Sequence, residues 1–449
     1  MADLYSNLFL NDLKNLKKLV LEYQSEFLHF FKLDKNIIPC NNNSLNETTY
    51  PIIFNDLLNT YSIPDYSFKI GNVAVKNPVV CAPLAGISDN TYRIFAKAFG
   101  SSLSFTEMIS SYGVYFNSKD SILLSNITEF ERPCGIQIFG SEPQIIAEAA
   151  QRLEDKAELI DINMGCPVPK VLRSKSGGFL LQDERRIKNI ISAVIFRIKK
   201  PLTIKARIGW DKNDINIERI AKLAESCGVS AITIHGRTVR QGFSGDVNYN
   251  VIKDVKRKVK IPVIVSGDIN SPSKAKKVLD FTGCDAVMIG RAVRGSLWIL
   301  FNILTAFYDK DYLLKLNINY SDDIYINTFN SNDNINDNIS NSKNIKNSNA
   351  VKKGIYKRDS NILNSDLNRY DVLNKSNYFN YIPELDWRKK FAELYLKFMI
   401  YFKGEDKAIK EFRKHLSWVF KGLAGVGKKR RVFYLIDTYN QAIKTINKL

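Results

Sequence analysis

The hydrophobic positions between residues 70 and 300 fall into eight short runs, about 25–40 residues apart. Several runs are apolar on successive residues, which is typical of parallel strands that are buried on both faces. The runs begin at Pro78, Leu103, Cys134, Leu159, Leu202, Ala231, Pro262 and Ala286. Helical patterns lie between them, for example over 142–155, 218–228 and 271–283. The last two patterns end on a glycine that can cap a helix.

Eight strands that alternate with helices predict an α/β fold, a (β/α)8 or TIM barrel. A doubly wound open sheet is the alternative. No glycine-rich dinucleotide fingerprint follows the first run, so the pattern favours the barrel.

Two helical regions flank the predicted barrel. Near the N-terminus, apolar residues recur at steps of three and four, which predicts an amphipathic helix; they are Phe9, Leu13, Leu16, Val20 and Tyr23. Near the C-terminus, two apolar faces at helical spacing predict a small all-helical domain. One face holds Trp387, Phe391, Leu394 and Phe398, and the other holds Phe412, Leu416, Val419 and Phe420.

A segment biased towards Asn, Ser, Asp, Ile and Lys separates the barrel from the C-terminal helices. It cannot bury enough apolar surface to offset its ordering entropy, so we expect a flexible insertion. The predicted organisation is a helical extension (1–65), a barrel (66–310), an Asn-rich insertion (316–380) and a helical domain (381–449).

Composition excludes several classes of protein. No stretch approaches the roughly 20 uninterrupted apolar residues that a membrane span needs, and the N-terminus lacks the apolar core of a signal peptide. The six cysteines are scattered and form no CxxC pair, which predicts neither a metal site nor a disulfide framework. We therefore expect a cytoplasmic protein with no membrane association and no obligate protein partner.

The charge is unevenly distributed. The formal net charge is +19, and residues 387–449 contain 16 Lys and Arg against 5 Asp and Glu, a net charge of +11. Aromatic residues are interleaved with these cations. Such a local excess favours a polyanionic partner such as nucleic acid.

Candidate chemistry comes from the polar residues at the ends of the predicted strands, because active sites of such barrels lie at the carboxyl ends of the strands. Taken singly, each of these residues has an ordinary structural explanation, but they fall at the same end of their strands. In chain order they are Pro83, Leu84 and Ala85; Gln137; Asn163 and Cys166; Lys205 and Arg207; His235; Ser266, Gly267 and Asp268; and Gly290 and Arg291.

The turns after the last two strands combine backbone N–H groups with a basic side chain, as in the usual phosphate site of these barrels. An amide at Gln137, a cation at Lys205 and an imidazole at His235 suit the polar edge of a flavin. From these residues alone we predict a phosphate-bearing cofactor, and FMN fits best.

Several motifs resemble those of the tRNA-dihydrouridine synthase family, in order and at matching intervals. They are "APLAGISDNTYR", "TEMIS", "GIQIFG", "DINMGCPVPK", "IKARIGW", "HGRT", "SGDI" and "IGRA", with "FRKHLSWVFKG" similar to the C-terminal helical signature of the family. The resemblance covers about 70–310 and 385–430. It leaves out the N-terminal extension and the Asn-rich insertion.

The resemblance implies an FMN enzyme that takes hydride from NADPH (or NADH) and reduces the C5–C6 double bond of a uridine in tRNA. Motif matching implies that FMN is held by Pro83, Leu84, Ala85, Gln137, Lys205, His235, Ser266, Gly267, Asp268, Gly290 and Arg291. Two departures stand out. The family usually has Asn where this chain has Ser266, and "RGSLWIL" replaces a Gly-Asn-Pro-Trp type of sequence.

The predicted chemistry needs a proton donor opposite the hydride donor. Cys166 suits that role, because a thiol with an ordinary pKa of about 8.5 is mostly protonated at pH 7. Asn163 and Arg207 are expected to contact the substrate, and Lys205 to stabilise negative charge. A base in folded tRNA must be turned out of its stack. Arg413, Lys414 and Lys421 of the basic helical domain are expected to contact the RNA.

Two other functions remain open on the residues alone. One is an FMN-dependent barrel reductase of a free pyrimidine, of the dihydroorotate dehydrogenase kind, although such a small substrate needs no basic helical domain. The other is a non-catalytic RNA-binding paralogue, which the presence of Cys166, Lys205 and His235 disfavours.

Overall fold

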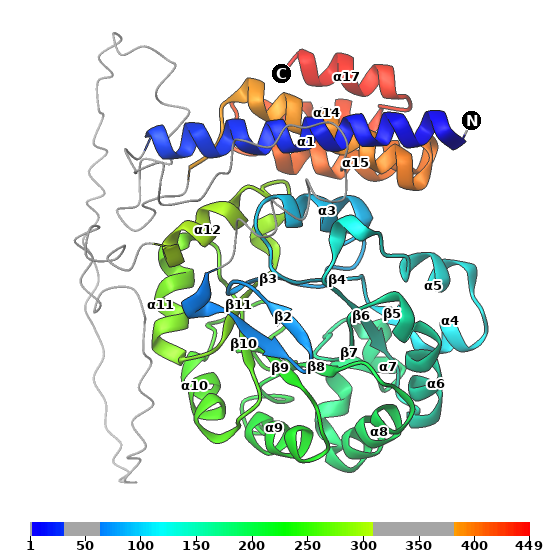
Figure 1. The fold of residues 1–449 in the computed structure, drawn as a ribbon, viewed down its shortest axis with the longest axis vertical. Helices are drawn as coiled ribbons and strands as arrows, with labels where there is room; N and C mark the ends of the chain where they lie inside the picture. The colour runs from blue at the N-terminus through cyan, green and yellow to red at the C-terminus, as the bar shows by residue number, and fades with distance from the viewer. Residues whose placement is uncertain (1, 31–62, 309–380) are drawn as a thin grey trace, which may run out of the picture.

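The computed structural model describes residues 2–30, 63–308 and 381–449, so the predicted insertion at 316–380 lies outside the described residues. Eight parallel strands form a barrel in the order β3-β11-β10-β9-β8-β7-β6-β4 (Figure 1). The backbone N–H of Cys81 donates to the carbonyl of Leu103 at 2.9 Å, which joins the first and last strands of that order. The predicted (β/α)8 barrel is therefore confirmed.

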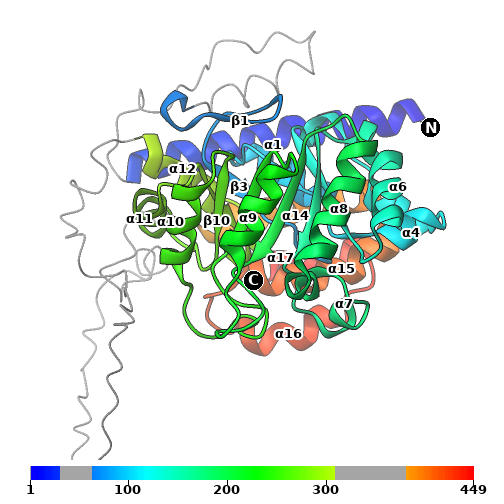
Figure 2. The ribbon, with the colours of Figure 1, turned by 90° about the horizontal axis from the view of Figure 1, so that it is seen from below.

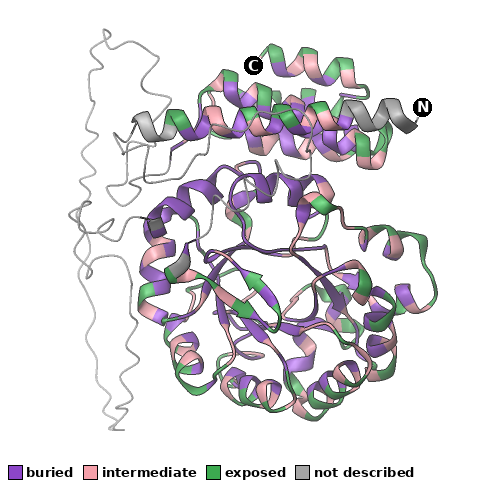
Figure 3. Ribbon diagram, viewed as in Figure 1, coloured by how far each residue is buried: buried purple, intermediate pink, exposed green. Residues whose placement is uncertain are grey.

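Each barrel strand coincides with one of the eight hydrophobic runs. The strands are β3 (Val79–Cys81), β4 (Ser104–Phe105), β6 (Cys134–Phe139), β7 (Leu159–Met164), β8 (Leu202–Arg207), β9 (Ala231–His235), β10 (Val263–Ser266) and β11 (Ala286–Ile289). A short strand that the pattern did not predict, β5 (Ile109–Ser110), pairs in parallel with β6. The barrel strands are mostly buried (Figure 3). Lys205 and His235 are half-buried exceptions.

Helices follow the strands and form the outer wall of the barrel. They are α3 (Asn90–Ala98), α4 (Ser111–Tyr115), α5 (Lys119–Leu124), α6 (Pro143–Leu153), α7 (Pro169–Arg173), α8 (Glu184–Arg197), α9 (Ile217–Ser226), α10 (Tyr249–Lys258), α11 (Pro272–Thr282) and α12 (Ile299–Tyr308). Helices α6, α9 and α11 match the three predicted segments. Gly283 ends α11 with a φ of 64° and donates its N–H to the carbonyl of Leu279, as a glycine cap does.

An antiparallel hairpin, β1 (Phe68–Ile70) and β2 (Val73–Val75), covers the amino ends of the barrel strands (Figure 1). Ile70 and Val75 are fully buried against residues at the starts of strands, including Ala231 and Ala286. Because the hairpin closes this end, the ligand cavity of the barrel lies at the opposite, carboxyl end.

The remaining helices form a bundle beside the barrel. They are α1 (Ala2–Phe30), α14 (Leu385–Lys403), α15 (Glu405–Val419), α16 (Val426–Tyr434) and α17 (Tyr439–Asn447). Leu16, Val20 and Tyr23 are fully buried, which confirms the predicted amphipathic helix near the N-terminus. Helix α1 lies along α14, so both ends of the chain contribute to this bundle (Figures 1 and 2). The division into domains stays a prediction.

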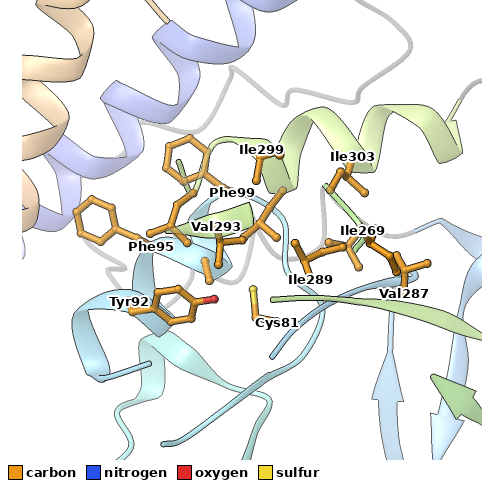
Figure 4. Close-up of a cluster of buried hydrophobic side chains, with 14 of the residues drawn as sticks. Cys81, Tyr92, Phe95, Phe99, Ile269, Val287, Ile289, Val293, Ile299 and Ile303 are labelled. Carbon is orange, nitrogen blue, oxygen red and sulfur yellow. The ribbon is translucent and has the colours of Figure 1, made fainter. Parts of the chain in front are cut away.

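Aromatic side chains join the bundle to the barrel. The ring of Phe95 on α3 lies 5.4 Å from Phe391 and 5.0 Å from Tyr395 of α14. The hydroxyl of Tyr23 donates to Oδ1 of Asn302 at 2.5 Å, which ties α1 to α12. Figure 4 shows the neighbouring part of the core, where α3, β3, β11 and α12 meet. The position of the bundle relative to the cavity is thus held by packing.

Among the described residues, no helix is both long enough and apolar enough to cross a lipid bilayer.

Candidate active site

A cavity of about 500 Å³ opens at the carboxyl ends of the barrel strands. The structure brings together all of the residues that the strand ends predicted, since each of them lines this cavity. They are Pro83, Leu84, Ala85, Gln137, Asn163, Cys166, Lys205, Arg207, His235, Ser266, Gly267, Asp268, Gly290 and Arg291. The barrel rule found them because parallel strands place all their carboxyl ends on one face.

The three basic residues predicted on the helical domain lie outside the cavity lining. Arg413 forms an ion pair of 2.6 Å with Asp437, and Lys421 is exposed. Lys414 donates from Nζ to the carbonyl of Gly86, directly after the Pro83–Ala85 segment. Helix α15 therefore touches the loop after β3 at the edge of the site.

Cys166 lies half-buried on the loop after β7 and is a free thiol. Its backbone N–H donates to Oδ1 of Asn163 at 2.9 Å, and its carbonyl accepts from Gly178 at 3.0 Å. Burial raises the pKa of the Cys166 thiol, while the positive charges of Arg207 and Lys205 oppose that shift. The thiol is consequently protonated at neutral pH.

The position next to this loop must be a glycine, because a side chain there would collide with Cys166. Gly177 has a φ of 61°, and a Cβ atom there would lie 3.1 Å from the Cβ of Cys166. Any larger residue would displace the loop that carries the thiol.

Lys205 and Arg207 lie two residues apart on β8, and both line the cavity as predicted. Burial and the neighbouring Arg207 lower the pKa of Lys205 to about 8, whereas Asp161 opposes the shift. The guanidinium of Arg207 donates to the carbonyls of Gly165 (2.9 Å) and Thr238 (2.8 Å). Arg207 therefore holds the Cys166 loop against the loop after β9.

His235 ends β9 and is uncharged. Burial, followed by the charges of Lys205 and Arg207, lowers the pKa of His235 to about 2. The backbone N–H of Arg237 lies 3.3 Å from Nδ1, so the ring proton is on Nε2. The imidazole can thus donate one hydrogen bond to a ligand.

The turn after β10 combines an unusual backbone with a pair of guanidinium groups. Gly267 and Asp268 have positive φ values of 120° and 46°. Burial would raise the pKa of Asp268, but Arg237 and Arg291 hold it below its usual range. Arg291 contacts the carboxylate at 2.7 Å and remains partly exposed at the mouth of the cavity. One carboxylate between two guanidinium groups leaves this turn with a net positive charge, which suits an anionic group.

Sequence reasoning missed three residues that shape the site. Asp161 lies two residues before Asn163 on β7, and strand alternation could have placed both on one face. Arg237 is the arginine of "HGRT" and pairs with Asp268. Phe243 lines the cavity, with the guanidinium carbons of Arg207 and Arg291 at 5.5 and 4.8 Å from its ring centroid. Sequence offered no signal for that stacking.

The fold and the site define an enzyme of the (β/α)8-barrel class, with a neutral thiol, a half-buried ammonium and an uncharged imidazole around one cavity. Residues 80–324 match the family model described as dihydrouridine synthase (Dus). The chain belongs to the dihydrouridine synthase family.

Curated relatives agree with this assignment. The chain is 43% identical over 245 residues to tRNA-dihydrouridine synthase B of Pasteurella multocida (strain Pm70), covering 54% of this chain and 73% of that protein. It is 44% identical over 234 residues to tRNA-dihydrouridine synthase B of Escherichia coli (strain K12), covering 51% and 72% respectively. Among solved structures, histamine dehydrogenase from Rhizobium sp. 4-9 is similar at a TM-score of 0.44 and 12% identity, over 55% of this chain and 48% of that one.

Proposed function

We propose that this protein reduces the C5–C6 double bond of specific uridines in tRNA, with FMN as cofactor and NADPH (or NADH) as reductant. Membership of the dihydrouridine synthase family supports the reaction. The observation that carries the proposal is the convergence of Cys166, Lys205 and His235 on one cavity in the barrel of this chain.

The cavity suits FMN in size and in chemistry. Its volume of about 500 Å³ lies within the range of roughly 300–1,000 Å³ that is typical of small-molecule sites. A Cβ atom at Gly290 would have Ala82 as its nearest neighbour, 3.9 Å away, so the backbone there leaves room for close approach of a ligand. FMN would be held by the lining residues that the sequence predicted, with the turns at Ser266–Asp268 and Gly290–Arg291 nearest its phosphate.

Each of several side chains has a separate role in the proposed reduction. FMN held by these residues and reduced by NADPH would supply the hydride for one carbon of the uracil double bond. The thiol of Cys166 donates a proton from Sγ to the other carbon and becomes a thiolate that solvent reprotonates. Lys205 places a positive charge at the buried end of the cavity, where it stabilises developing negative charge. Asn163 and Arg207 hold the backbone of the loop that carries the thiol.

Flavin content tests the proposal directly. Purified protein is expected to be yellow, to bind FMN at one equivalent per chain and to lose its flavin absorbance when NADPH is added without oxygen. Adding tRNA that lacks dihydrouridine should restore the absorbance, whereas free uracil and orotate should not. A colourless protein that cannot be reconstituted with FMN would contradict the cofactor assignment. Reoxidation by orotate alone would instead indicate a free-pyrimidine reductase.

We propose that the basic helix α16 also contacts tRNA. Lys429, Arg430 and Arg431 are exposed there, and Figure 2 shows α16 at the same end of the molecule as α7, the short helix after Cys166. Neutralising all three is expected to weaken tRNA binding and to reduce the salt dependence of the affinity by about one unit of slope for each phosphate that is no longer bound. Equilibrium binding between low and moderate salt measures both quantities.

A matched control is neutralisation of Arg185 and Lys188, which are exposed on α8 of the barrel wall. This variant should keep the affinity and the slope of the original protein. If the α16 variant behaved in the same way, the RNA surface would lie elsewhere.

A further inference from the structure

We propose that Asp161 is a positioning residue that fixes the turn carrying Cys166, acting through the side-chain amides of Gln137 and Asn163. The inference rests on the proposed function for the reaction, but its geometry stands on this chain alone. Asp161 itself does not line the cavity, and the strand-end residues named from the sequence do not include it.

Strand register brings the side chains of Gln137, Asp161 and Thr203 into one row across three strands, with Asn163 next to that row. In the sheet, Asp161 on β7 is the partner of Gln137 on β6 and of Thr203 on β8. Asn163 follows two residues later on β7, so it shares a face with Asp161. The hydroxyl of Thr203 donates to Oδ1 of Asp161 at 2.7 Å, and Gln137 donates from Nε2 to Oδ2 at 2.7 Å.

The chain of hydrogen bonds continues to the catalytic loop. Asn163 donates from Nδ2 to Oε1 of Gln137 at 2.8 Å. Its own Oδ1 accepts the backbone N–H groups of Gly165 (3.1 Å) and Cys166 (2.9 Å). Four side chains on three neighbouring strands therefore connect the interior of the barrel to the turn that holds the thiol.

The direction of this chain is determined from the loop end. Backbone N–H groups can only donate, so the atom of Asn163 that faces them must be its oxygen. Its nitrogen then faces Gln137 and must meet the oxygen of that amide. The nitrogen of Gln137 in turn faces Asp161, which must accept. If either amide were flipped, two N–H groups would face each other without an acceptor between them. An acceptor at position 161 is therefore needed to keep both amides, and with them the Cys166 turn, in this arrangement.

Asp161 is buried, so replacing it with a residue that cannot accept a hydrogen bond leaves a buried donor unpaired. Its side chain is 1% exposed, and burial raises the pKa of Asp161 to about 6, opposed by the hydrogen bonds from Thr203 and Gln137 and by Lys205. The carboxyl is consequently ionised at neutral pH, with both oxygens accepting. Without it, the buried side-chain N–H of Gln137 loses its partner, and the amide that orients Asn163 is no longer fixed. The grip of Asn163 on the backbone N–H groups of Gly165 and Cys166 then loosens, although the contacts of Arg207 with Gly165 and of Gly178 with Cys166 remain.

Two substitutions separate the acceptor from the charge. Asp161→Asn retains an oxygen that can accept from Gln137, and its amide nitrogen can donate to the hydroxyl oxygen of Thr203. Asp161→Leu can do neither. Thr203→Val removes only the donor on the far side and serves as the control. If the role is positioning, Asp161→Leu should disturb the Cys166 turn while Asp161→Asn and Thr203→Val should not.

The first readout needs no activity and no cofactor. Alkylation of Cys166 by iodoacetamide in the flavin-free protein, followed by peptide mass spectrometry, is expected to become about tenfold faster in Asp161→Leu and to change little in the other two variants. Cys227, which follows the last residue of α9 and does not line the cavity, reports in the same sample whether folding is intact. Equal labelling of Cys166 in all variants would overturn the proposal. So would an Asp161→Asn variant as reactive as Asp161→Leu, because then the charge would be the cause.

The second readout separates the two half-reactions. In flavin-loaded Asp161→Leu, reoxidation by tRNA should slow on the order of a hundredfold, while reduction by NADPH stays within a few-fold of the original rate. Should Asp161→Leu fail to fold, Gln137→Met interrupts the same chain with Asp161 in place and should loosen Cys166 equally. A protein that never binds flavin would contradict the proposed function. Flavin binding with normal reoxidation of the Leu variant would contradict only the role of Asp161.

Discussion

Replacement of Cys166 by alanine is expected to slow tRNA reduction by roughly 10²–10⁴-fold, the usual contribution of a positioned general acid. Flavin binding and tRNA binding should survive, because the loop is anchored through the backbone N–H and carbonyl of Cys166, which alanine retains. Single-turnover reoxidation of the reduced flavin by tRNA measures the effect, and equilibrium binding confirms that both ligands are retained.

Cys227→Ala is the matched control, since this cysteine is also half-buried but lies at the end of α9. It should reduce tRNA at the original rate. Normal turnover in the Cys166→Ala variant would remove the thiol from the mechanism. A proton would then have to come from solvent or from another group in the cavity.

The second large effect is expected for Lys205→Met. This change removes the positive charge from the cavity and should slow reduction by roughly 10²–10³-fold, the scale found when one preorganised electrostatic interaction is removed. FMN should also bind more weakly, because Lys205 lines the predicted flavin site. Methionine keeps most of the apolar stem, so the packing of β8 is retained. Lys212→Met, on the exposed loop after β8, is the control and should change neither quantity.

The pH profile provides an independent check on Lys205. The pKa of Lys205 is lowered to about 8, and that of Cys166 is raised above its ordinary value. Both groups act in their protonated forms, so activity should hold below pH 8 and fall as the pH rises through it. In Lys205→Met the fall near pH 8 should disappear, leaving only a fall at higher pH from Cys166. His235, with a pKa of about 2, stays neutral throughout and should contribute no limb.

Much of the fold was predictable from local patterns. The apolar runs of parallel strands and the capped helices between them are each encoded within about a dozen residues, as at Gly283, where a glycine after a helical stretch marks its end. The amphipathic α1 was equally clear. Its packing against α12 was not, because the hydrogen bond between Tyr23 and Asn302 joins positions 279 residues apart.

The residues that line the site were also predictable, because the carboxyl ends of all strands in a (β/α)8 barrel lie on one face. Cys166, Lys205 and His235 needed only the strand pattern to be placed on one face. The bonds among site residues depend on more than that. Arg207 holds loop carbonyls, and Asp268 pairs with both Arg237 and Arg291. Those partners come from different strands and loops, so no spacing along the chain indicates them.

The sequence by itself determined the barrel, the end of it that carries the chemistry and the thiol on the loop after β7. These follow from hydrophobic periodicity and turn residues, which act over short stretches of chain. Only the tertiary structure decided that burial raises the pKa of the Cys166 thiol further, that His235 is neutral and that Asp161 lies at the far end of the amide chain. Burial and the register between strands set those properties, and both arise only when distant segments pack together.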